Sequence, residues 1–570
     1  MGAKKAIVLA AGFGTRLRPF TACVPKPLLP VWGEPMLARV VATLRAWGVE
    51  EIAVNCHHLA GQVADWCAAN GCRAVREDPI LGTGGVMNPL RGWIGGDDFY
   101  LVNGDIVLEG VENNPFDAPD PSRGLVKPED IIGRCLLAGT GPRTVEADPD
   151  GFVTCWKSPD PGWPGTFTYC GVALLKAKIL DYVAPEGFST IVQAYERAMA
   201  DGLFVRGLSP ECLMWTDAGT VPAYIEVNSD GDDNAFAEIP QIKAALAAAD
   251  LAPDASVSFI GARGSDRCFF KAGDGAIAIV YDDSKRAENA RYAGHARWLA
   301  EHGVPVPKVL ADLPELKTLV LSNGGEPRKM SFSEYGAVVD ALAAFNALDP
   351  AGLDLEPPFD AALWEWERDL FAEHCLRGRF AADMPPAAAA ELEKVALLLD
   401  AEPKALVHRD FQSENVVWRG DAPTIIDFQG MRRGPAVYDL ASLLYDPYAE
   451  VSEDDRAALA SRYGAACGRP GIAKILPFAA VQRLVQCLGA YGRLASVGQP
   501  QFGRHVLPAL EHLLAAADEA GLDAVGGLAE DLIAKETHFI EESRRHAHSR
   551  GCTCAHAHDS GCTCGHGGRA

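Results

Sequence analysis

The sequence predicts an α/β domain with a mostly parallel sheet, followed by a two-lobed α+β domain. The chain has 570 residues, more than one hydrophobic core usually serves, so about two to four domains are expected. In the first ~230 residues short apolar runs alternate with helical patterns, which is typical of a sheet covered by helices on both faces. After about residue 254 a hairpin pattern comes first, and helical patterns dominate from Ser331 onward.

The N-terminal half begins with an apolar run at 6–12 that predicts a buried strand. A helix is expected over 36–49, where the apolar residues fall on one stripe at helical spacing: Leu37, Val40, Val41, Leu44 and Trp47. Further strands are expected at 51–56, 72–77 and 99–106. The stretch 110–130 is rich in Pro, Gly and Asp, which indicates an irregular insertion.

The composition changes near 228–256, where an acidic loop and an Ala-rich helix lead to a proline turn. We therefore expect a first domain at 1–230, a linker at 231–253, a second domain at 254–543 and a tail at 544–570. The second domain is expected to open with a small β-rich lobe, whose strands lie at 256–260, 267–272 and 276–281 and whose helix lies at 287–302.

Charge and composition narrow the class of partner. The net charge is −24 and the isoelectric point is near 5.0, which argues against nucleic acid or an anionic membrane as the main partner. No run approaches the roughly 18 apolar residues that span a bilayer. The N-terminus has a short apolar run like that of a signal peptide, but it passes directly into GTRLRP. We expect a cytoplasmic protein with reduced thiols that binds small molecules, and the oligomeric state stays open.

Glycines and basic residues follow the first strand, in LAAGFGTRLRP (9–19). Gly12 and Gly14 allow a positive φ and a close approach of backbone N–H groups to phosphate oxygens. Arg16 and Arg18 add charge-assisted donors, and Lys26 adds a point charge between two prolines. A dinucleotide-binding fingerprint is excluded, because a leucine stands where its third glycine belongs.

These motifs resemble those of the sugar-1-phosphate nucleotidyltransferase family. LAAGFGTRLRP is followed by PKPLLPVWGEPML, and LGTGGVM (81–87), LVNGDI (101–106) and WTDAGT (215–220) are similar to the family's base-binding and metal-binding segments. The resemblance covers about residues 4–228 and implies a Rossmann-like, GT-A-like fold. In the family's reaction a sugar phosphate attacks the α-phosphorus of a nucleoside triphosphate, and pyrophosphate leaves.

The resemblance also implies roles for single residues. Two anions meet in this reaction, so Asp105 and Asp217 are expected to hold Mg²⁺, with Asp105, Arg16 and Lys26 as the catalytic set that faces the triphosphate. Lys157 would contact the sugar phosphate, although a tryptophan precedes it where the family often has glutamate. The remaining residues expected to bind substrate are Gly12, Gly14, Thr15, Gly82, Thr83, Gly84, Gly85 and Asn103.

The second half carries VHRDFQSENVVW (407–418) followed by IIDFQG (425–430). H-R-D-x4-N is the spacing of a kinase catalytic loop, in which Asp410 orients the substrate hydroxyl and accepts its proton. Asn415 and Asp427 are then expected to bind the Mg²⁺ that bridges the ATP phosphates. His408 and Arg409 belong to the same loop and are expected at the nucleotide.

These segments resemble the aminoglycoside-phosphotransferase and choline-kinase superfamily of small-molecule kinases. With RRGPAVYDLASLLYD (432–446), they are most similar to the bacterial anomeric kinases for N-acetylmuramate and N-acetylglucosamine. The resemblance covers about residues 254–520 and implies a two-lobed, protein-kinase-like fold. Its phosphate-covering hairpin would hold Gly264, Ser265 and Asp266. No lysine stands at the usual third-strand position, and Lys271 and Lys285 are open candidates for that role.

A kinase that makes a sugar 1-phosphate supplies the substrate of a nucleotidyltransferase, and tethering the two raises the local concentration of the intermediate. The paired families imply ATP-dependent phosphorylation of the anomeric hydroxyl of N-acetylmuramate and/or N-acetylglucosamine. Uridylyl transfer from UTP would follow, in peptidoglycan recycling.

Three alternatives stay open. The first is a choline kinase joined to a CTP:phosphocholine cytidylyltransferase, which would need an aromatic box from residues such as Trp364, Trp366 and Tyr438. The second is a pair of enzymes for another sugar, such as a heptose. The third is a regulatory or scaffold protein with one inactive site.

The tail contains Cys552, Cys554, Cys562 and Cys564 among several histidines. Thiolate and imidazole groups suit Zn²⁺ or Cu⁺. The spacing is CxC rather than the CxxC of most zinc folds, so a metal site and a disordered tail without a dedicated site both stay open.

Overall fold

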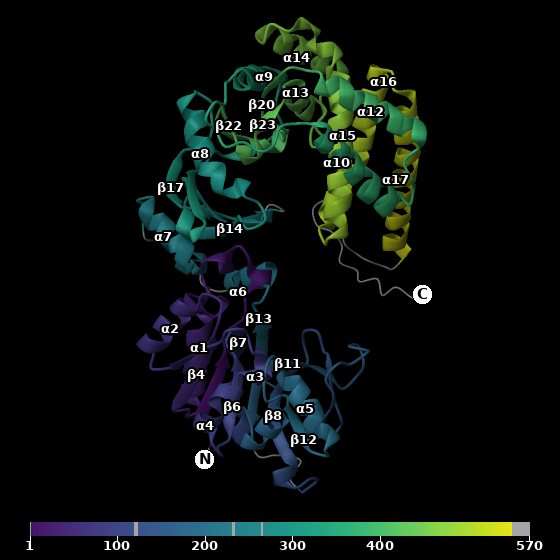
Figure 1. The fold of residues 1–570 in the computed structure, drawn as a ribbon. Coiled ribbons are helices and arrows are strands. Elements are labelled where there is room, and N and C mark those ends of the chain that lie inside the picture. The colour runs from purple at the N-terminus through teal and green to yellow at the C-terminus, as the bar shows by residue number, and fades with distance from the viewer. Residues whose placement is uncertain are drawn as a thin grey trace. The chain divides into compact units, whose positions relative to one another are not determined.

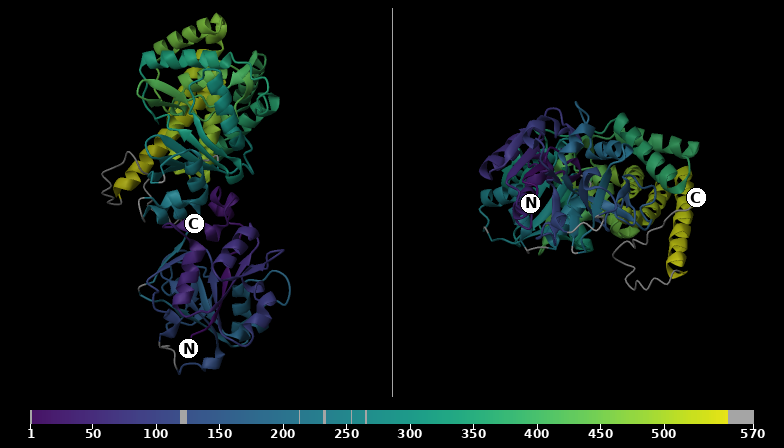
Figure 2. Two further views of the ribbon diagram at one scale, coloured as in Figure 1. Left: turned by 90° about the vertical axis from the view of Figure 1, so that its left-hand side faces the viewer. Right: turned by 90° about the horizontal axis from the view of Figure 1, so that it is seen from below.

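A computed structural model describes residues 2–118, 124–211, 213–230, 234–252, 254–263 and 266–549 (Figures 1 and 2). The chain forms two compact units. Unit 1 is made of Met1–Arg286 and Leu310–Leu321, and unit 2 is made of Ala287–Val309 and Ser322–Ala570. Unit 1 thus takes in a sheet that the sequence assigns to the second domain, while the expected domain boundaries themselves stay a prediction.

A nine-stranded mixed sheet forms the centre of unit 1. Its parallel strands lie in the order β6-β1-β4-β5, and β11 runs antiparallel between β6 and β8. The strands are β1 (Lys5–Leu9), β4 (Glu51–Cys56), β5 (Arg73–Arg76), β6 (Phe99–Asn103), β8 (Ile131–Ala138), β9 (Val145–Ala147), β10 (Val153–Cys155), β11 (Thr166–Leu175) and β12 (Phe204–Leu208). The strands expected from the apolar runs of this half are confirmed, and the first of them ends at Leu9, where the glycine-containing loop begins.

Helices cover both faces of this sheet, as the alternating pattern predicts. On β1, Ala6 and Val8 pack in a cluster with α1, while Ile7 between them packs in another cluster with α5. This alternation follows from the two-residue period of a strand. The helices are α1 (Met36–Ala46), α2 (Ala60–Ala69), α3 (Gly82–Gly85), α4 (Arg91–Ile94), α5 (Ile191–Ala200), α6 (Val221–Ser229) and α7 (Pro240–Ala248).

Unit 1 also contains smaller sheets. β7 (Ile106–Glu109) pairs with β13 (Met214–Asp217), and β2 (Pro30–Val31) pairs with β3 (Glu34–Pro35). A five-stranded sheet follows α7 in the order β14-β15-β16-β18-β17. Its strands are β14 (Val257–Arg263), β15 (Arg267–Ala272), β16 (Ala276–Tyr281), β17 (Val309–Leu313) and β18 (Thr318–Ser322). The hairpin pattern of the sequence is therefore confirmed.

Unit 2 is mainly helical around two small sheets, one of β20 and β23 and one of β19, β21 and β22. The strands are β19 (Glu326–Pro327), β20 (Lys404–Val407), β21 (Val416–Arg419), β22 (Ala422–Ile425) and β23 (Arg432–Pro435). The helices are α8 (Glu288–Glu301), α9 (Phe332–Asn346), α10 (Ala361–Leu370), α11 (Gly378–Phe380), α12 (Pro386–Asp400), α13 (Val437–Leu444), α14 (Glu453–Ala466), α15 (Leu476–Ser496), α16 (Val506–Ala520) and α17 (Asp523–Ser549).

The last three helices of unit 2, α15 to α17, lie side by side in Figure 1 and contact one another in sequence order. The HRD loop connects β20 to β21, so it is held between the two small sheets. None of the helices within the described residues is long and apolar enough to cross a membrane.

Candidate active sites

The first candidate site lies at the carboxyl ends of β1 and β6. These strands are neighbours, with Leu9 opposite Asn103, and the Gly104 N–H donates to the Leu9 carbonyl over 2.8 Å. From β1 the chain continues to β4 and β5 on one side of it and then to β6 on its other side, so the strand order reverses at β1. Open α/β sheets bind ligands at such a point, so the fold places the glycine-containing loop and Asp105 in the expected crevice.

Four charged residues meet in this crevice. The Lys26 ammonium lies 2.6 Å from Asp105 Oδ2 and 3.6 Å from Asp217 Oδ1, and Arg16 Nη2 lies 3.8 Å from Asp217 Oδ2. Asp217 reaches the site because β13 places it opposite Ile106, the residue after Asp105. The structure therefore brings together the four residues that the sequence singled out for catalysis and metal binding in this half.

These side chains fit a small hard cation. The Asp105 and Asp217 carboxylates converge on the Lys26 ammonium. Mg²⁺ commonly takes one or two protein carboxylates and completes its shell with water and phosphate oxygens. A Cβ on Gly219 would lie 2.5 Å from Asp217 Oδ1 and 3.0 Å from Lys26 Nζ, so the backbone here leaves no room for a side chain. No group of three or more His, Cys, Asp or Glu side chains suited to a metal occurs among the described residues.

The loop after β1 differs from expectation in two details. Gly14 has a φ of 62° and begins the short 3-10 turn Thr15–Leu17, but Gly12 does not take a positive φ. Arg18 does not face the crevice as a phosphate donor, because its Nη1 donates to Asp282 Oδ2 over 2.9 Å and to Ser284 Oγ over 2.6 Å. Thr15 and Arg16 stay exposed in the loop.

The glycines of α3 pack against the backbone before α5. The N–H groups of Gly84 and Gly85 donate to the Ser189 carbonyl over 2.8 Å and 3.1 Å, and Thr83 Oγ1 accepts from the Ile191 N–H over 2.9 Å. A Cβ on Gly82 would lie 2.6 Å from the Ser189 carbonyl oxygen. Close packing against the backbone near Ser189 therefore explains why glycine stands at these positions, in addition to any contact with a base.

The other two binding residues expected in this half lie in different surroundings. Asn103 ends β6 and packs beneath Gly171, where a Cβ would lie 2.4 Å from Asn103 Nδ2. Lys157 is exposed after the buried Trp156, whose ring stacks on Tyr195 at 4.8 Å. The tryptophan that departs from the family pattern is thus a core residue.

A buried network that the sequence analysis missed links the loop after β1 to the LGTGG segment. Asn55 Oδ1 accepts from the Ala10 N–H over 2.6 Å, and Asn55 Nδ2 donates to Glu77 Oε1 over 2.8 Å. Glu77 Oε2 then accepts from the Leu81 N–H over 2.8 Å. Polar residues at the carboxyl ends of β4 and β5 were the available signal, because parallel strands end at the same edge of the sheet.

The second candidate site is the HRD loop of unit 2. Arg483 on α15 donates from Nη1 to Asp410 Oδ1 over 2.8 Å and to Gln486 Oε1 over 2.6 Å. Burial raises the pKa of Asp410, but the charges of Arg483 and Arg409 outweigh it, so this pKa is lowered overall. The carboxylate is therefore held ionised, with Oδ1 engaged by Arg483.

The two expected metal ligands follow in the chain. Asn415 Nδ2 donates to the Asp410 carbonyl over 2.8 Å, which turns the side chain so that its Oδ1 is buried without a hydrogen-bond partner. Such an orphaned amide oxygen fits a hard cation. Asp427 has a φ of 67° and accepts from Gln429 Nε2 over 3.1 Å. These contacts suit Mg²⁺ at Asn415 and Asp427.

His408 and Arg409 form the frame of this site. The His408 and Arg409 N–H groups both donate to the buried Asp439 over 2.7 Å, and His408 Nε2 contacts the Ile426 carbonyl at 3.0 Å. Asp446 similarly accepts from the Ser413 N–H and Oγ, at 2.7 Å and 2.5 Å. Buried carboxylates on or beside α13 therefore fix the loop that carries Asp410.

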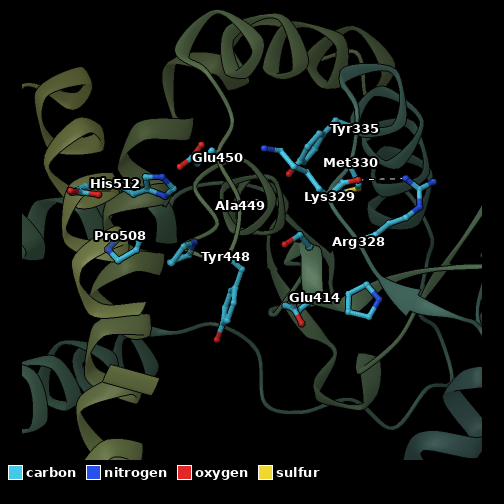
Figure 3. Close-up of a pocket in the computed structure, with 14 residues that line it drawn as sticks. Arg328, Lys329, Met330, Tyr335, Glu414, Tyr448, Ala449, Glu450, Pro508 and His512 are labelled. Atoms are coloured by element: carbon cyan, nitrogen blue, oxygen red, sulfur yellow. Dashed lines mark hydrogen bonds between the residues drawn. The ribbon is translucent and has the colours of Figure 1, made fainter. Parts of the chain in front are cut away.

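A cavity of about 460 Å³ adjoins the loop on the side of Ser413 and Glu414 (Figure 3). Figure 3 shows Arg328 and Glu414 on one side of it and Tyr448 and His512 on the other. His512 Nδ1 contacts the Tyr445 carbonyl at 3.1 Å, and burial lowers the pKa of this histidine. The cavity thus presents polar groups of both charges beside the loop.

Other expected residues lie elsewhere. Gly264 and Ser265 lie outside the described residues, and so do the four cysteines of the tail. Asp266 is in unit 1 at the turn between β14 and β15, with a φ of 55°. Lys271 pairs with Asp274 at 2.8 Å on the opposite turn of that sheet, beside the end of β15.

Comparison with known proteins gives a match in each half. Residues 6–110 match the MobA-like NTP transferase domain, and residues 257–478 match the phosphotransferase enzyme family. An N-acetylmuramate alpha-1-phosphate uridylyltransferase of Neisseria meningitidis is 28% identical over 228 residues, 38% of this chain and 94% of its own length. An N-acetylmuramate/N-acetylglucosamine kinase of Pseudomonas aeruginosa is 27% identical over 255 residues, 41% of this chain and 75% of its own length.

A solved structure, the inositol-1-phosphate CTP transferase from T. maritima, is 16% identical with a TM-score of 0.33, over 40% of this chain and 96% of its own. The sequence matches and the two sites agree on the enzyme classes. The chain joins an N-terminal NTP transferase domain to a C-terminal kinase domain.

Proposed function

We propose that this chain is a bifunctional salvage enzyme that converts N-acetylmuramate, and/or N-acetylglucosamine, into its UDP derivative. The observation that carries the proposal is that relatives of the two halves are named for one sugar. One is named as a kinase of N-acetylmuramate and N-acetylglucosamine, and the other as a uridylyltransferase of N-acetylmuramate alpha-1-phosphate. We place the reaction in the cytoplasm, where ATP and UTP are available, as a step of peptidoglycan recycling.

In the first step Asp410 accepts the proton of the anomeric hydroxyl, and the oxygen of that hydroxyl attacks the γ-phosphorus of ATP. The bond between the γ-phosphorus and ADP breaks. The products are the sugar 1-phosphate and ADP. Asn415 and Asp427 would hold Mg²⁺, which would neutralise charge on the phosphates. Arg483 keeps the base ionised, and a weak base suffices because the hydroxyl of a hemiacetal is more acidic than an ordinary alcohol.

In the second step a phosphate oxygen of the sugar 1-phosphate attacks the α-phosphorus of UTP, and the bond to pyrophosphate breaks. Arg16 and Lys26 would pair with the triphosphate oxygens. Asp105 and Asp217 would hold Mg²⁺, which would allow the two anions to approach.

The alternative with choline has less support. Two of the three aromatic residues considered for its box, Trp364 and Tyr438, are almost fully buried and pack against Phe359 at 4.5 Å and 4.8 Å. They are core residues of unit 2 and leave no space for a quaternary ammonium between them. Neither of the relatives described above is named for choline.

The test uses two full-length variants with Mg²⁺, ATP and UTP. Asp410→Asn should make no UDP-sugar from free N-acetylmuramate but should make it from the 1-phosphate. Asp105→Asn should consume ATP and accumulate the 1-phosphate. If wild-type protein makes UDP-sugar from neither substrate, the proposed function is wrong. If both variants lose sugar phosphorylation, or both lose UDP-sugar formation from the 1-phosphate, the assignment of separate sites is wrong.

A further inference from the structure

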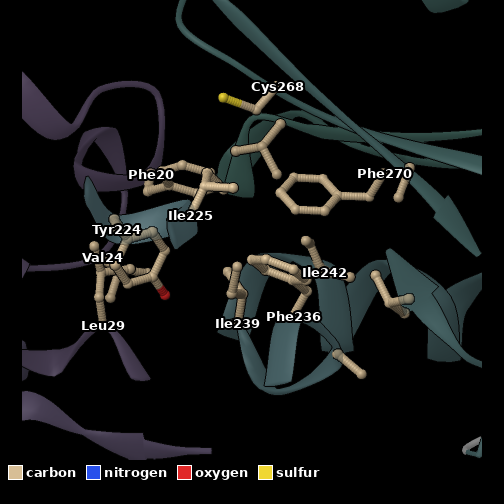
Figure 4. Close-up of a cluster of buried hydrophobic side chains, with 14 of the residues drawn as sticks. Phe20, Val24, Leu29, Tyr224, Ile225, Phe236, Ile239, Ile242, Cys268 and Phe270 are labelled. Atoms are coloured by element: carbon tan, nitrogen blue, oxygen red, sulfur yellow. The ribbon is translucent and has the colours of Figure 1, made fainter. Parts of the chain in front are cut away.

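The loop that carries Arg16 and Lys26 packs against the sheet of β14 to β18. Phe20 of this loop is fully buried and lies 6.1 Å from the ring of Phe270 on β15 (Figure 4). One hydrophobic core contains apolar residues of the loop, of α6 and α7, and of β15 and β16: Leu17, Phe20, Val24, Tyr224, Ile225, Ile242, Ala245, Cys268, Phe270 and Val280. The loop and the sheet are therefore one packed body.

Polar contacts join the same two segments. Arg18 Nη1 donates to Asp282 Oδ2 and to Ser284 Oγ, and the Ser284 N–H donates to Asp282 Oδ1 over 3.0 Å. Asp282 directly follows β16, and only 7% of its side chain is exposed. From α7, Gln241 Nε2 donates to the Phe20 carbonyl over 2.7 Å. A buried carboxylate and a buried amide thus hold the loop at adjacent points.

The loop needs such support because it has little regular structure of its own. Between β1 and β2 it contains three 3-10 turns of three residues each. Arg18 stands between Arg16 and Lys26 in the chain, so a shift at Arg18 moves the two cations that face the triphosphate. A displacement of ~1 Å at a reacting group can cost about 100-fold in rate.

From these contacts we infer that Asp282 is a positioning residue for uridylyl transfer. It lies beyond the region that resembles a nucleotidyltransferase, on the first sheet of the kinase half, and it acts through Arg18. This inference rests on the proposed function of the first site. The kinase half thus supplies Asp282 as a structural support for uridylyl transfer, the reaction of the N-terminal half.

The test is a double-mutant cycle on the full-length protein, with UTP and N-acetylmuramate 1-phosphate as substrates. Arg18→Met and Asp282→Asn should each lower kcat/KM for UTP by about 10- to 100-fold, while KM for the sugar phosphate stays near the wild-type value. Because the two residues act through each other, the double variant should be no worse than the poorer single variant. Additive losses would overturn the inference.

Asp283→Asn is the matched control. Asp283 is the next residue, but it pairs with Lys317 at 2.5 Å rather than with the loop. It should leave uridylyl transfer unchanged. A fall in the thermal midpoint of Asp282→Asn with kcat/KM for UTP at the wild-type value would show a merely structural bridge. Wild-type uridylyl transfer with an unaffected Asp282→Asn overturns this inference alone, whereas an inactive wild type overturns the proposed function.

Discussion

Asp410 is engaged by Arg483, which stands 73 positions further along the chain. The HRD pattern locates the base, but a pattern of neighbouring residues contains no information on a partner from α15. Burial and the guanidinium act on the pKa of Asp410 in opposite directions, and the guanidinium charges prevail. The acidity of the base is therefore set by tertiary contacts.

Arg483→Met should move the acid limb of the kinase pH profile to higher pH. The charges of Arg483 and Arg409 hold the pKa of Asp410 below its usual range, and without the charge of Arg483 burial would raise that pKa. The measurement is kcat/KM for the sugar across the acid range. Arg483→Lys keeps a positive charge and should restore part of the shift. An acid limb that stays in place in Arg483→Met would contradict this role.

Gly219→Ala should impair uridylyl transfer and spare sugar phosphorylation. The added Cβ would lie 2.5 Å from Asp217 Oδ1 and 3.0 Å from Lys26 Nζ, so the charged side chains of the site must shift. We expect at least a ~10-fold fall in kcat for the transferase, measured as pyrophosphate release. Gly61→Ala on α2 is the control, because a Cβ there meets nothing within 4 Å. Equal activities of the two variants would refute the crowded geometry.

At the scale of elements, the structure follows the sequence where periodicity is strong. The α/β alternation, the hairpin of β14 to β16 and helix α8 all follow from apolar spacing. The HRD loop is also recognisable, but the carboxylates that fix it are not. Asp439 and Asp446 lie in a helical apolar pattern in which an acidic residue gives no sign of its partner. Only the fold shows that they accept backbone N–H groups.

Asp439→Ala should destabilise unit 2 strongly. The N–H groups of His408 and Arg409 would lose their acceptor inside the protein, and each buried unpaired donor costs about 1–3 kcal/mol. The expected loss is therefore about 2–6 kcal/mol, measured by urea unfolding of the full chain. Asp340→Ala removes an exposed ion pair with Arg462 and should cost at most ~1 kcal/mol. Similar losses in both variants would contradict the assigned role of Asp439.

At the scale of the whole molecule, the core behind the loop after β1 decides where the chain can be divided. The composition near 228–256 indicates a linker, yet Ile242 and Ala245 of α7 are fully buried in the same core as Phe20. The sequence could not show this, because a short Ala-rich helix is compatible with both a tether and a packed element.

A fragment of residues 1–230 should consequently be less stable than a fragment of residues 1–321. The shorter fragment exposes Phe20 and Tyr224, which are fully buried in the chain, and loses the bond from Arg18 to Asp282. We expect a lower thermal midpoint and aggregation on heating for the shorter fragment, followed by circular dichroism and light scattering. Equal midpoints would mean that the sheet of β14 to β18 contributes nothing to the transferase fold.

In the proposed function one magnesium-dependent centre makes a sugar 1-phosphate and a second, separate one uses it. Mixing two variant chains, each inactive at one centre, tests this most directly. Full-length Asp105→Asn and Asp410→Asn are each supplied with N-acetylmuramate, ATP, UTP and Mg²⁺, alone and together. Neither alone should form UDP-N-acetylmuramate, whereas the mixture should form it, because the 1-phosphate made by one chain is used by the other. A mixture as inactive as its components would contradict the account.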